Sequence, residues 1–482
     1  MLNLRPILFI LGLLLSTLAL AMSVPALVDA ITGHPDWQVF LASAGLTLFI
    51  GISLILTMRG GDMTIGIRET FVLTLASWLG VTLFASLPFV FAHLNLSFAD
   101  AFFEAMSGIT TTGATVIIDL DVAPPGILLW RGLLQWLGGI GIIVTAVALL
   151  PMLKVGGMQL FRMESSDTSE KVLPRAAQIS AAIGSIYSVL TAICAIAYWL
   201  AGMPGFDAVV HAMTTIATGG FSTSDASIGA FANPAVEWIA VVFMIVGSLP
   251  FVLYLQAIRG RPMSLLRDSQ VKWFVVLVLI LVVMVILVLE FSLDLSTSRS
   301  IRLSAFNTVS IMTGTGYSTA AFDTWGSFAL TIFFLIMFIG GCAGSTTCGI
   351  KIFRFQILYE TATAQIRRLV RPHGVFIPYY NRNPITDEVT MSVMSFFFFY
   401  ILVFAALALG LSILGLDFLT AMSGAATAIS NVGPGLGPII GPSSTFISLP
   451  DAAKWLLSAG MLLGRLELFT ILVLFAPAFW KP

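Results

Sequence analysis

Long runs of apolar residues without a charged side chain recur along the whole chain. A helix needs about 20 apolar residues to cross a hydrocarbon core of ~30 Å. Nine runs reach or approach this length: 6–28, 37–58, 70–92, 132–153, 176–203, 238–258, 273–289, 324–350 and 389–416. A tenth, 455–480, is interrupted by Arg465 and Glu467. The pattern predicts ten transmembrane helices, and this even number places both termini on the same side.

Four connections between these runs contain a further apolar stretch of about a dozen residues, which suits a half-helix that enters and leaves the membrane on one side. These connections follow the third, fifth, seventh and ninth runs. The stretches end in related sequences: Thr-Thr-Gly-Ala-Thr at 111–115, Thr-Gly-Gly-Phe-Ser at 218–222, Thr-Gly-Thr-Gly-Tyr-Ser at 313–318 and Asn-Val-Gly-Pro-Gly at 431–435. The first two follow an Ala-Met-[Ser/Thr] at identical spacing, whereas Met422 and Gly433 of the fourth are eleven residues apart.

The four stretches divide the chain into repeats, and repeats indicate architecture more reliably than a single motif. We therefore predict an all-α polytopic membrane protein. It has ten transmembrane helices and four re-entrant pore half-helices, arranged as four fused span–pore loop–span repeats around one pore. The expected divisions are two amino-terminal transmembrane helices at 1–58 and pore repeats at 59–153, 154–258, 259–358 and 359–482.

Composition and charge add the class and the orientation. The 482 residues are 58% hydrophobic and 10% charged, whereas about 25% of a soluble protein is charged, so a soluble globular protein is excluded. The connections 59–69, 154–175, 259–272 and 351–388 hold 16 of the 23 Lys and Arg residues. The positive-inside rule therefore places these connections and both termini in the cytoplasm. The run 6–28 resembles a signal peptide, but its length favours a retained helix.

The ends of the half-helices are the candidate ion site. Backbone carbonyls can replace the hydration shell of a cation without a fixed charge, and glycine permits the backbone angles that turn neighbouring carbonyls the same way. For one loop alone, close packing of small residues is the alternative, but four copies favour a pore. The residues predicted to form the ion-binding selectivity filter are Thr111, Thr112, Gly113, Thr218, Gly219, Gly220, Thr315, Gly316, Asn431, Val432 and Gly433.

Acidic residues predominate near the outer segments, where ten Asp and Glu residues face four basic ones. Such a bias raises the local concentration of cations. Asp100, Asp207 and Asp417 precede the half-helices, and capping of these helices is the simpler reading of their position.

Two features below the predicted filter indicate a gate. Four glycines within ten residues break the apolar run 324–350, and irregular backbone at membrane depth requires a protein or water-filled surrounding. The predicted gate consists of Gly340, Gly341, Gly344, Ser345, Thr346, Thr347 and Gly349, together with Arg465. A close helix–helix contact is the alternative for the glycines.

Arg465 lies inside the last apolar run, where a charge costs at least ~2.5 kcal/mol. We expect Arg465 to project into the conduction path beneath the filter as a barrier to cations. A structural arginine bonded to carbonyls of neighbouring segments is the alternative. Glu467, two residues away, points to another helix face and is not an expected partner within the helix.

With these motifs the chain resembles the Trk/Ktr/HKT superfamily of potassium transporters, most closely its bacterial TrkH/TrkG branch. The resemblance covers essentially the whole chain. It rests on the four loop sequences, on Gly-Gly-x-x-Gly-Ser-Thr-x-x-Gly-Ile-Lys at 340–351 and on Gly-Arg-Leu-Glu at 464–467. The two additional amino-terminal helices also resemble the TrkH branch rather than the shorter KtrB branch.

The resemblance implies channel-like potassium uptake across the bacterial inner (plasma) membrane, with K⁺ as the transported ion at the filter residues and no organic cofactor in this chain. Gly113, Gly220, Gly316 and Gly433 occupy the filter-glycine positions of the superfamily. In plant relatives a serine at the first position accompanies a sodium preference, so Gly113 favours potassium.

The resemblance also implies partners. Relatives are homodimers with one pore per protomer, gated by a cytosolic TrkA-like regulatory subunit that binds ATP/ADP or NAD(H). The basic connections 154–175, 259–272 and 351–388 are candidate docking surfaces for it. The lipid bilayer is the other partner, and no nucleic acid is expected.

A secondary cation transporter coupled to Na⁺ or H⁺ is the alternative function. Such folds usually have inverted repeats and buried carboxylates near the midplane, whereas the repeats here are parallel and Glu467 is the only carboxylate inside a predicted span. An intramembrane enzyme would need a catalytic constellation at depth. We expect none, because His93, His211 and His373 lie at or outside the span boundaries and His34 lies in an outer loop.

Overall fold

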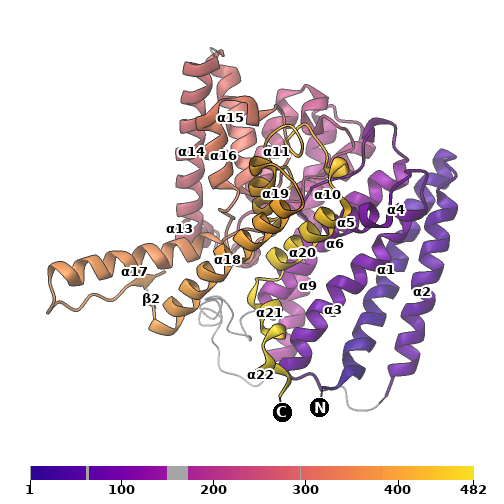
Figure 1. The fold of residues 1–482 in the computed structure, drawn as a ribbon, viewed down its shortest axis with the longest axis horizontal. Helices are drawn as coiled ribbons and strands as arrows, with labels where there is room; N and C mark the ends of the chain where they lie inside the picture. The colour runs from indigo at the N-terminus through magenta and orange to yellow at the C-terminus, as the bar shows by residue number, and fades with distance from the viewer. Residues whose placement is uncertain (1, 61–63, 149–171, 294, 382, 482) are drawn as a thin grey trace.

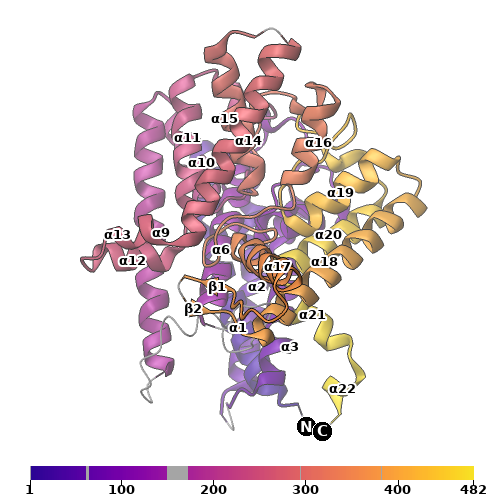
Figure 2. The same ribbon diagram turned by 90° about the vertical axis from the view of Figure 1, so that its left-hand side faces the viewer.

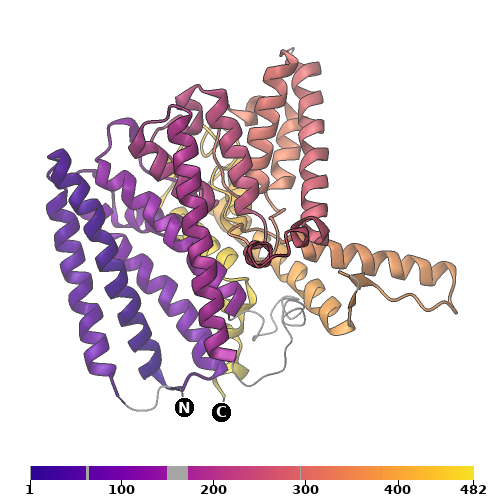
Figure 3. The same ribbon diagram turned by 180° about the vertical axis from the view of Figure 1, so that it is seen from behind.

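The computed structural model describes residues 2–60, 64–148, 172–293, 295–381 and 383–481, and most of these residues are helical (Figure 1). Helices α1 (Leu4–Thr32) and α2 (Trp37–Met58) pack along each other at one edge of the molecule (Figures 1 and 3). The chain enters α1 through Asn3, whose side chain accepts a hydrogen bond from Arg5 N, and leaves it through Gly33 in the left-handed conformation. The first and last described residues lie at the same end of the molecule.

After these two helices, one order of elements recurs four times: a long helix, a short helix, an irregular loop and a second helix. The first set is α3 (Ile67–Ala85), α4 (Leu87–Phe91), α5 (Phe98–Ile109), η1 (Leu120–Val122) and α6 (Pro125–Ala148). The second is α9 (Val172–Leu200), α10 (Gly205–Ile216), η2 (Ser227–Phe231), α11 (Pro234–Gly247), α12 (Phe251–Ile258) and α13 (Met263–Arg267).

The third set is α14 (Ser269–Leu293), α15 (Thr297–Met312), η3 (Phe322–Thr324), α16 (Ser327–Ile336) and α17 (Ile352–Val370). The fourth is β1 (Tyr379–Tyr380), β2 (Asn383–Pro384), α18 (Asp387–Ile413), α19 (Phe418–Ser430), η4 (Phe446–Ser448), α20 (Asp451–Arg465), α21 (Phe469–Leu472), η5 (Val473–Phe475) and α22 (Pro477–Trp480). The short helices α5, α10, α15 and α19 are the half-helices of the four sets, and we call them the pore helices.

The second helices of three sets are broken, which the sequence pattern did not anticipate for two of them. Within the described residues, seven helices are long and apolar enough to cross a membrane, or up to nine if each bent pair is one span. The expected span 238–258 bends by 90° between α11 and α12, and 455–480 bends by 106° between α20 and the segment after it. Pro250, which lacks a backbone N–H, precedes α12, and Glu467 and Leu468 adopt positive φ after α20.

The expected span 324–350 contains only ten α-helical residues, those of α16. The chain then forms a loop over 337–351 before α17 begins, in keeping with its glycine content. Half of the connection 351–388, expected as a loop, is the helix α17, which projects sideways from the body in Figure 1 and is seen end-on in Figure 2.

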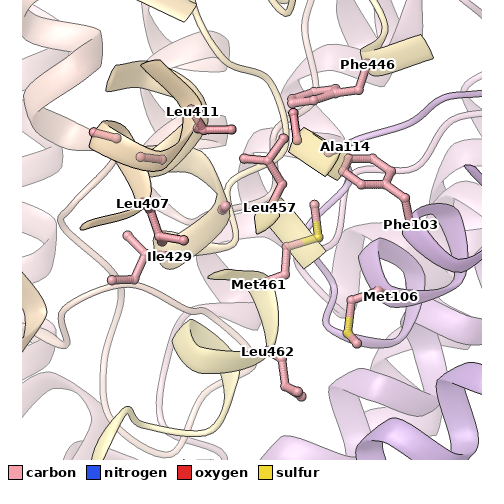
Figure 4. Packing of buried hydrophobic residues seen from close by; sticks show 14 of the residues in the cluster. Phe103, Met106, Ala114, Leu407, Leu411, Ile429, Phe446, Leu457, Met461 and Leu462 are labelled. Atoms are coloured by element: carbon pink, nitrogen blue, oxygen red, sulfur yellow. The ribbon is translucent and has the colours of Figure 1, made fainter. Parts of the chain in front are cut away.

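Neighbouring sets pack against each other in a closed order. Contacts join α6 to α10, α11 to α15 and α20 to α5, and one apolar cluster joins Ile311 and Phe333 of the third set to Ala426 and Val432 of the fourth. Figure 4 shows the contact that closes the circle: Phe103, Met106 and Ala114 of the first set lie among side chains of the fourth. Those labelled from the fourth set are Leu407, Leu411, Ile429, Phe446, Leu457, Met461 and Leu462.

Glycines bring three second helices close to the ends of the pore helices. A β-carbon at Gly138, Gly247 or Gly464 would lie within 3.0 Å of one backbone carbonyl oxygen, that of Ile109, Ile216 or Ile429 respectively. Ile109, Ile216 and Ile429 each stand four positions before a glycine of the predicted filter: Gly113, Gly220 and Gly433 respectively. Packing of backbone against backbone thus fixes the depth of these pore helices.

Candidate functional site

The four pore helices end in the same hydrogen-bonded turn. In each, a residue in the left-handed conformation follows the helix, and the next N–H donates to the carbonyl five residues earlier, as in a Schellman cap. The left-handed residues are Thr111 (φ 53), Thr218 (φ 50), Gly314 (φ 69) and Asn431 (φ 52). The donors and acceptors are Thr112 and Ser107 (2.8 Å), Gly219 and Thr214 (2.9 Å), Thr315 and Ser310 (2.9 Å), and Val432 and Thr427 (3.1 Å).

Two residues after the left-handed residue, each loop places a glycine with positive φ. These angles are 89° at Gly113, 75° at Gly220, 81° at Gly316 and 107° at Gly433. Residues with a β-carbon rarely adopt such angles. The four loops therefore share one backbone course, with positive φ at alternate positions.

The four loops form a closed ring. A β-carbon at each glycine would lie less than 3.0 Å from the carbonyl oxygen of the residue before the glycine in the next loop. The pairs are Gly113 with Gly219 O, Gly220 with Thr315 O, Gly316 with Val432 O and Gly433 with Thr112 O. The order first, second, third, fourth and back to first is complete. We call the oxygens of Thr112, Gly219, Thr315 and Val432 the carbonyl ring.

The geometry of the ring corrects how the four loop sequences align with one another, and it adds one residue to the predicted filter. In all four loops a hydroxyl residue stands six positions before the glycine: Ser107, Thr214, Ser310 and Thr427. The fourth loop therefore has the same spacing between its hydroxyl residue and its glycine as the other three loops. Met422 precedes the true counterpart of Met106 by more than one helical turn. Gly314 is the counterpart of Thr111, Thr218 and Asn431, although the sequence does not predict it as a filter residue.

A cavity of about 370 Å³ opens beside the ring, and all four ring glycines line it. Its walls come mainly from the loops that follow the pore helices, including Asp119 and Asp225, and Arg131 of α6 also lines it. Asp225 accepts hydrogen bonds from Leu120 N at 3.1 and 3.2 Å, which ties the first loop to the second. The cavity is thus a polar vestibule that leads to the carbonyl ring.

The three aspartates expected as helix caps divide into two kinds. Asp100 forms a capping box with Ser97 at the start of α5, and it also pairs with Lys454 at 2.5 Å. Asp417 caps α19 by accepting from Thr420 N at 3.1 Å, and this interaction with Thr420 holds the pKa of Asp417 below its ordinary value. Asp207 accepts from Thr223 Oγ1 at 2.7 Å instead, so it ties the helix to its own loop.

Behind the vestibule lies a buried ion pair that the sequence did not indicate. Arg131 Nε donates to Glu104 Oε1 at 2.8 Å, and the two side chains are 1% and 0% exposed. Arg131 also donates to Ser222 O at 2.7 Å and Thr115 Oγ1 at 3.1 Å. The pair therefore links the first and second loops just outside the ring. Glu104 is neutralised here and adds little to the outer negative charge.

Replacing Glu104 with glutamine should destabilise the protein strongly, because the Arg131 guanidinium would stay buried without a counter-charge. Breaking a buried pair on one side typically costs about 3–5 kcal/mol. Thermal unfolding of the detergent-purified protein measures the loss. The matched control is Glu237→Gln, whose partner Arg302 is 25% exposed and can be hydrated. An equal loss in both variants would contradict the role of burial.

The loop 337–351 lies directly beneath the ring. Thr346 Oγ1 is 3.0 Å from Ile216 O and 2.9 Å from Gly247 O, and it accepts a hydrogen bond from Thr218 Oγ1 at 3.1 Å. Cys348 Sγ is 4.0 Å from Thr111 Oγ1. The loop therefore contacts the loops that follow α5 and α10 and the break that follows α11.

Arg465 is 2% exposed and reaches this loop from the end of α20. Its guanidinium donates to Thr346 O at 3.3 Å, to Cys348 Sγ at 2.6 Å and to Gly138 O at 2.9 Å. The hydrogen bonds to carbonyls of neighbouring segments are those expected of a structural arginine. The position beneath the ring is the one expected of a barrier to cations. Among the described residues, Arg465 has no carboxylate within ion-pair distance.

Two titratable groups have buried contacts that the sequence did not indicate. Glu467 does find a partner, Arg354 at 2.5 Å, but from another part of the chain. His211 lies in α10, outside the predicted spans as expected, and is fully buried there, with Nδ1 2.8 Å from Asp207 O and Nε2 3.0 Å from Ser222 Oγ. Its neighbours are a backbone carbonyl and a hydroxyl, which do not make a catalytic constellation.

Comparisons with known proteins agree with this geometry. The family model TrkH, described as a cation transport protein, matches residues 37–481. The chain is 49% identical to the Trk system potassium uptake protein TrkI of Halomonas elongata, over 99% of this chain and 97% of the relative. The chain belongs to the TrkH family of cation transport proteins. The resemblance stated from the sequence motifs is thereby confirmed, as is the expectation that the chain is not an enzyme.

Other members of the TrkH family match over the full length as well. TrkH of Escherichia coli K12 is 38% identical over 99% of both chains. The crystal structure of the potassium transporter TrkH from Vibrio parahaemolyticus superposes with a TM-score of 0.92 at 38% identity and covers all of both chains. The all-helical, multi-pass membrane architecture therefore rests on sequence and fold together.

Proposed function

We propose that this protein takes up potassium across the bacterial inner membrane, and that K⁺ crosses through the carbonyl ring. The single observation that carries the proposal is the closure of four equivalent glycine loops on one vestibule. A ring of uncharged oxygens can replace the hydration shell of a cation and still release it. The relatives are named as potassium uptake proteins of the Trk system, which favours K⁺ over other cations.

In this proposal the K⁺ ligands are the filter residues of each loop, from the left-handed residue to the glycine. They are Thr111, Thr112 and Gly113; Thr218, Gly219 and Gly220; Gly314, Thr315 and Gly316; and Asn431, Val432 and Gly433. The carboxyl-terminal ends of the four pore helices add about −0.5 charge each near the ring. Together they favour a cation without holding it by a full charge.

We further propose that the loop 337–351 is the gate. Its position beneath the ring and its bonds to Thr218, Gly247 and Arg465 support this role. Gly340, Gly341, Gly344 and Gly349 give the backbone freedom to rearrange, and Ser345, Thr346 and Thr347 provide the bonds that hold the closed form. Arg465 places a positive charge in the path when the loop is in this position.

The proposed topology has ten crossings, with a broken helix completing each of the last three repeats and both termini in the cytoplasm. The repeats would occupy 59–153, 154–258, 259–358 and 359–482 after the helices of 1–58; the boundary at 153 and 154 lies outside the described residues. We propose a homodimer, gated by a cytosolic TrkA-like subunit that binds ATP/ADP or NAD(H). The connections 259–272 and 351–388 are its candidate docking surfaces, while most of 154–175 lies outside the described residues.

Purified protein in proteoliposomes should carry K⁺ down its gradient more readily than Na⁺, and a cytosolic nucleotide-binding partner with its nucleotide should change the rate. The measurement is the reversal potential under K⁺ and Na⁺ gradients, together with Rb⁺ uptake. A pH gradient at fixed K⁺ is the second arm. A reversal potential that follows the pH gradient would overturn the channel-like mechanism in favour of coupled transport, and an absence of K⁺ flux would overturn the function.

A further inference from the structure

Gln135 of α6 contacts the second filter loop on both sides of its glycine. The side chain is fully buried. Its Nε2 donates to Gly219 O at 2.6 Å, and its Oε1 accepts from Phe221 N at 3.0 Å. A backbone N–H can only donate, so the contact with Phe221 fixes which end of the amide faces Gly219.

This contact makes the carbonyl ring unequal. Among the hydrogen bonds between described residues, Gly219 O accepts one and the oxygens of Thr112, Thr315 and Val432 accept none. The side-chain hydrogen bond between the first and fourth loops does not involve a ring oxygen: Asn431 Nδ2 donates to Thr112 Oγ1 at 2.9 Å. The same Nδ2 also donates to Met461 O at 2.9 Å. One ring oxygen in four is thus held by the protein itself.

The local sequence is fitted to this contact. A β-carbon at Gly219 would lie within 3.0 Å of the Gln135 amide, so glycine is required here for a reason separate from backbone angle. A carbonyl oxygen has two lone pairs, and one remains for a cation. The hydrogen bond fixes where that oxygen stands and lowers the electron density it offers to the ion.

We propose that Gln135 is a specificity-determining residue, whose amide clamps the second filter loop around Gly220 and sets the position of Gly219 O in the carbonyl ring. The inference rests on the proposed role of the ring in K⁺ transport. Discrimination between K⁺ and Na⁺ depends on the positions and field strength of the coordinating carbonyls. A loop without its clamp can adjust to the smaller ion.

The experiment compares Gln135→Leu and Gln135→Glu with the unchanged protein in proteoliposomes under opposing K⁺ and Na⁺ gradients. Leucine removes both hydrogen bonds. Glutamate keeps the acceptor for Phe221 N and replaces the donor that faces Gly219 O with an oxygen. We expect both variants to lower the K⁺/Na⁺ permeability ratio, by roughly fivefold for leucine, equivalent to about 1 kcal/mol at ~1.4 kcal/mol per tenfold.

Trp136→Phe is the matched control, because it removes a hydrogen bond of the next residue on α6, to Thr191 Oγ1 at 3.1 Å, without touching the ring. Its permeability ratio should equal that of the unchanged protein.

Elution profile and melting temperature show whether each variant is folded. A folded Gln135→Leu with an unchanged ratio overturns the inference. If the Gln135→Leu variant does not fold, the Gln135→Glu variant provides the test. An unchanged K⁺/Na⁺ permeability ratio in a folded Gln135→Glu variant overturns the inference as well. If the unchanged protein itself does not select K⁺ over Na⁺, the proposed function is refuted instead.

Discussion

Replacing Gly113 with serine is expected to bring the K⁺/Na⁺ permeability ratio close to one. A β-carbon at this position would lie less than 3.0 Å from Gly219 O, and it would also approach Thr315 O in the third loop. The side chain would therefore enter the space that the carbonyl ring encloses. A ring that cannot place its oxygens around K⁺ loses the advantage that compensates for dehydration of this ion. The measurement is the reversal potential in proteoliposomes.

The control separates occlusion of the ring from backbone strain. Gly202 has φ 97, similar to φ 89 at Gly113, but a β-carbon there meets nothing within 4 Å. Gly202→Ser thus adds the strain of a left-handed non-glycine residue, about 1–2 kcal/mol, in an open outer turn. We expect it to keep the ratio of the unchanged protein. Equal ratios in the two serine variants would show that Gly113 does not line the ion path.

Replacing Arg465 with alanine is expected to raise K⁺ flux in the absence of any regulatory partner. The change removes a buried positive charge beneath the ring and the bonds from the guanidinium to Thr346 O and Gly138 O. We expect an increase of roughly tenfold, which corresponds to removal of about 1.4 kcal/mol of electrostatic repulsion from the barrier. Rb⁺ uptake into proteoliposomes without nucleotide or partner measures the effect.

Two further variants separate the charge from the bonds. Arg465→Lys keeps the charge but loses the forked geometry, whereas Arg465→Gln loses the charge but can still donate to one carbonyl. If charge forms the barrier, lysine stays near the basal flux and glutamine resembles alanine. If the bonds alone hold the loop 337–351 in place, the order reverses. Basal flux in the alanine variant would count against any gating role for Arg465.

The broken second helices show where sequence patterns become unreliable. The run 238–258 is uninterrupted in hydropathy, yet the chain turns by 90° between α11 and α12. Hydropathy reports that a segment avoids water, and it does so equally for a straight helix and for a bent one packed against protein. In the structure, Ser248 O accepts from Cys342 N at 3.1 Å and Gly247 O accepts from Thr346 Oγ1 at 2.9 Å, so the loop 337–351 packs against the bend.

The alignment of the four loop sequences shows a similar limit of sequence patterns. Matching Met422 to Met106 gave the fourth loop an extra spacing, although Thr427 matches Ser107 in hydrogen bonding. Side-chain likeness misled here, because the ring is built from backbone atoms. Positive φ at Gly314 and Asn431 identified the equivalent positions, and a pattern of glycine and asparagine at helix ends is the signal that could have found them.

The sequence by itself determined that this is a helical membrane protein with four apolar half-helices ending in glycine loops. It could do so because, without water to satisfy the backbone, each segment must meet its own hydrogen bonds, so class and element type are local properties. Only the tertiary structure decided the order in which the loops close, the pairing of Glu467 with Arg354, the bonds of Arg465 and the clamp from Gln135 to the second loop. These contacts join residues far apart in the chain, and their partners depend on how the four sets of helices pack against one another.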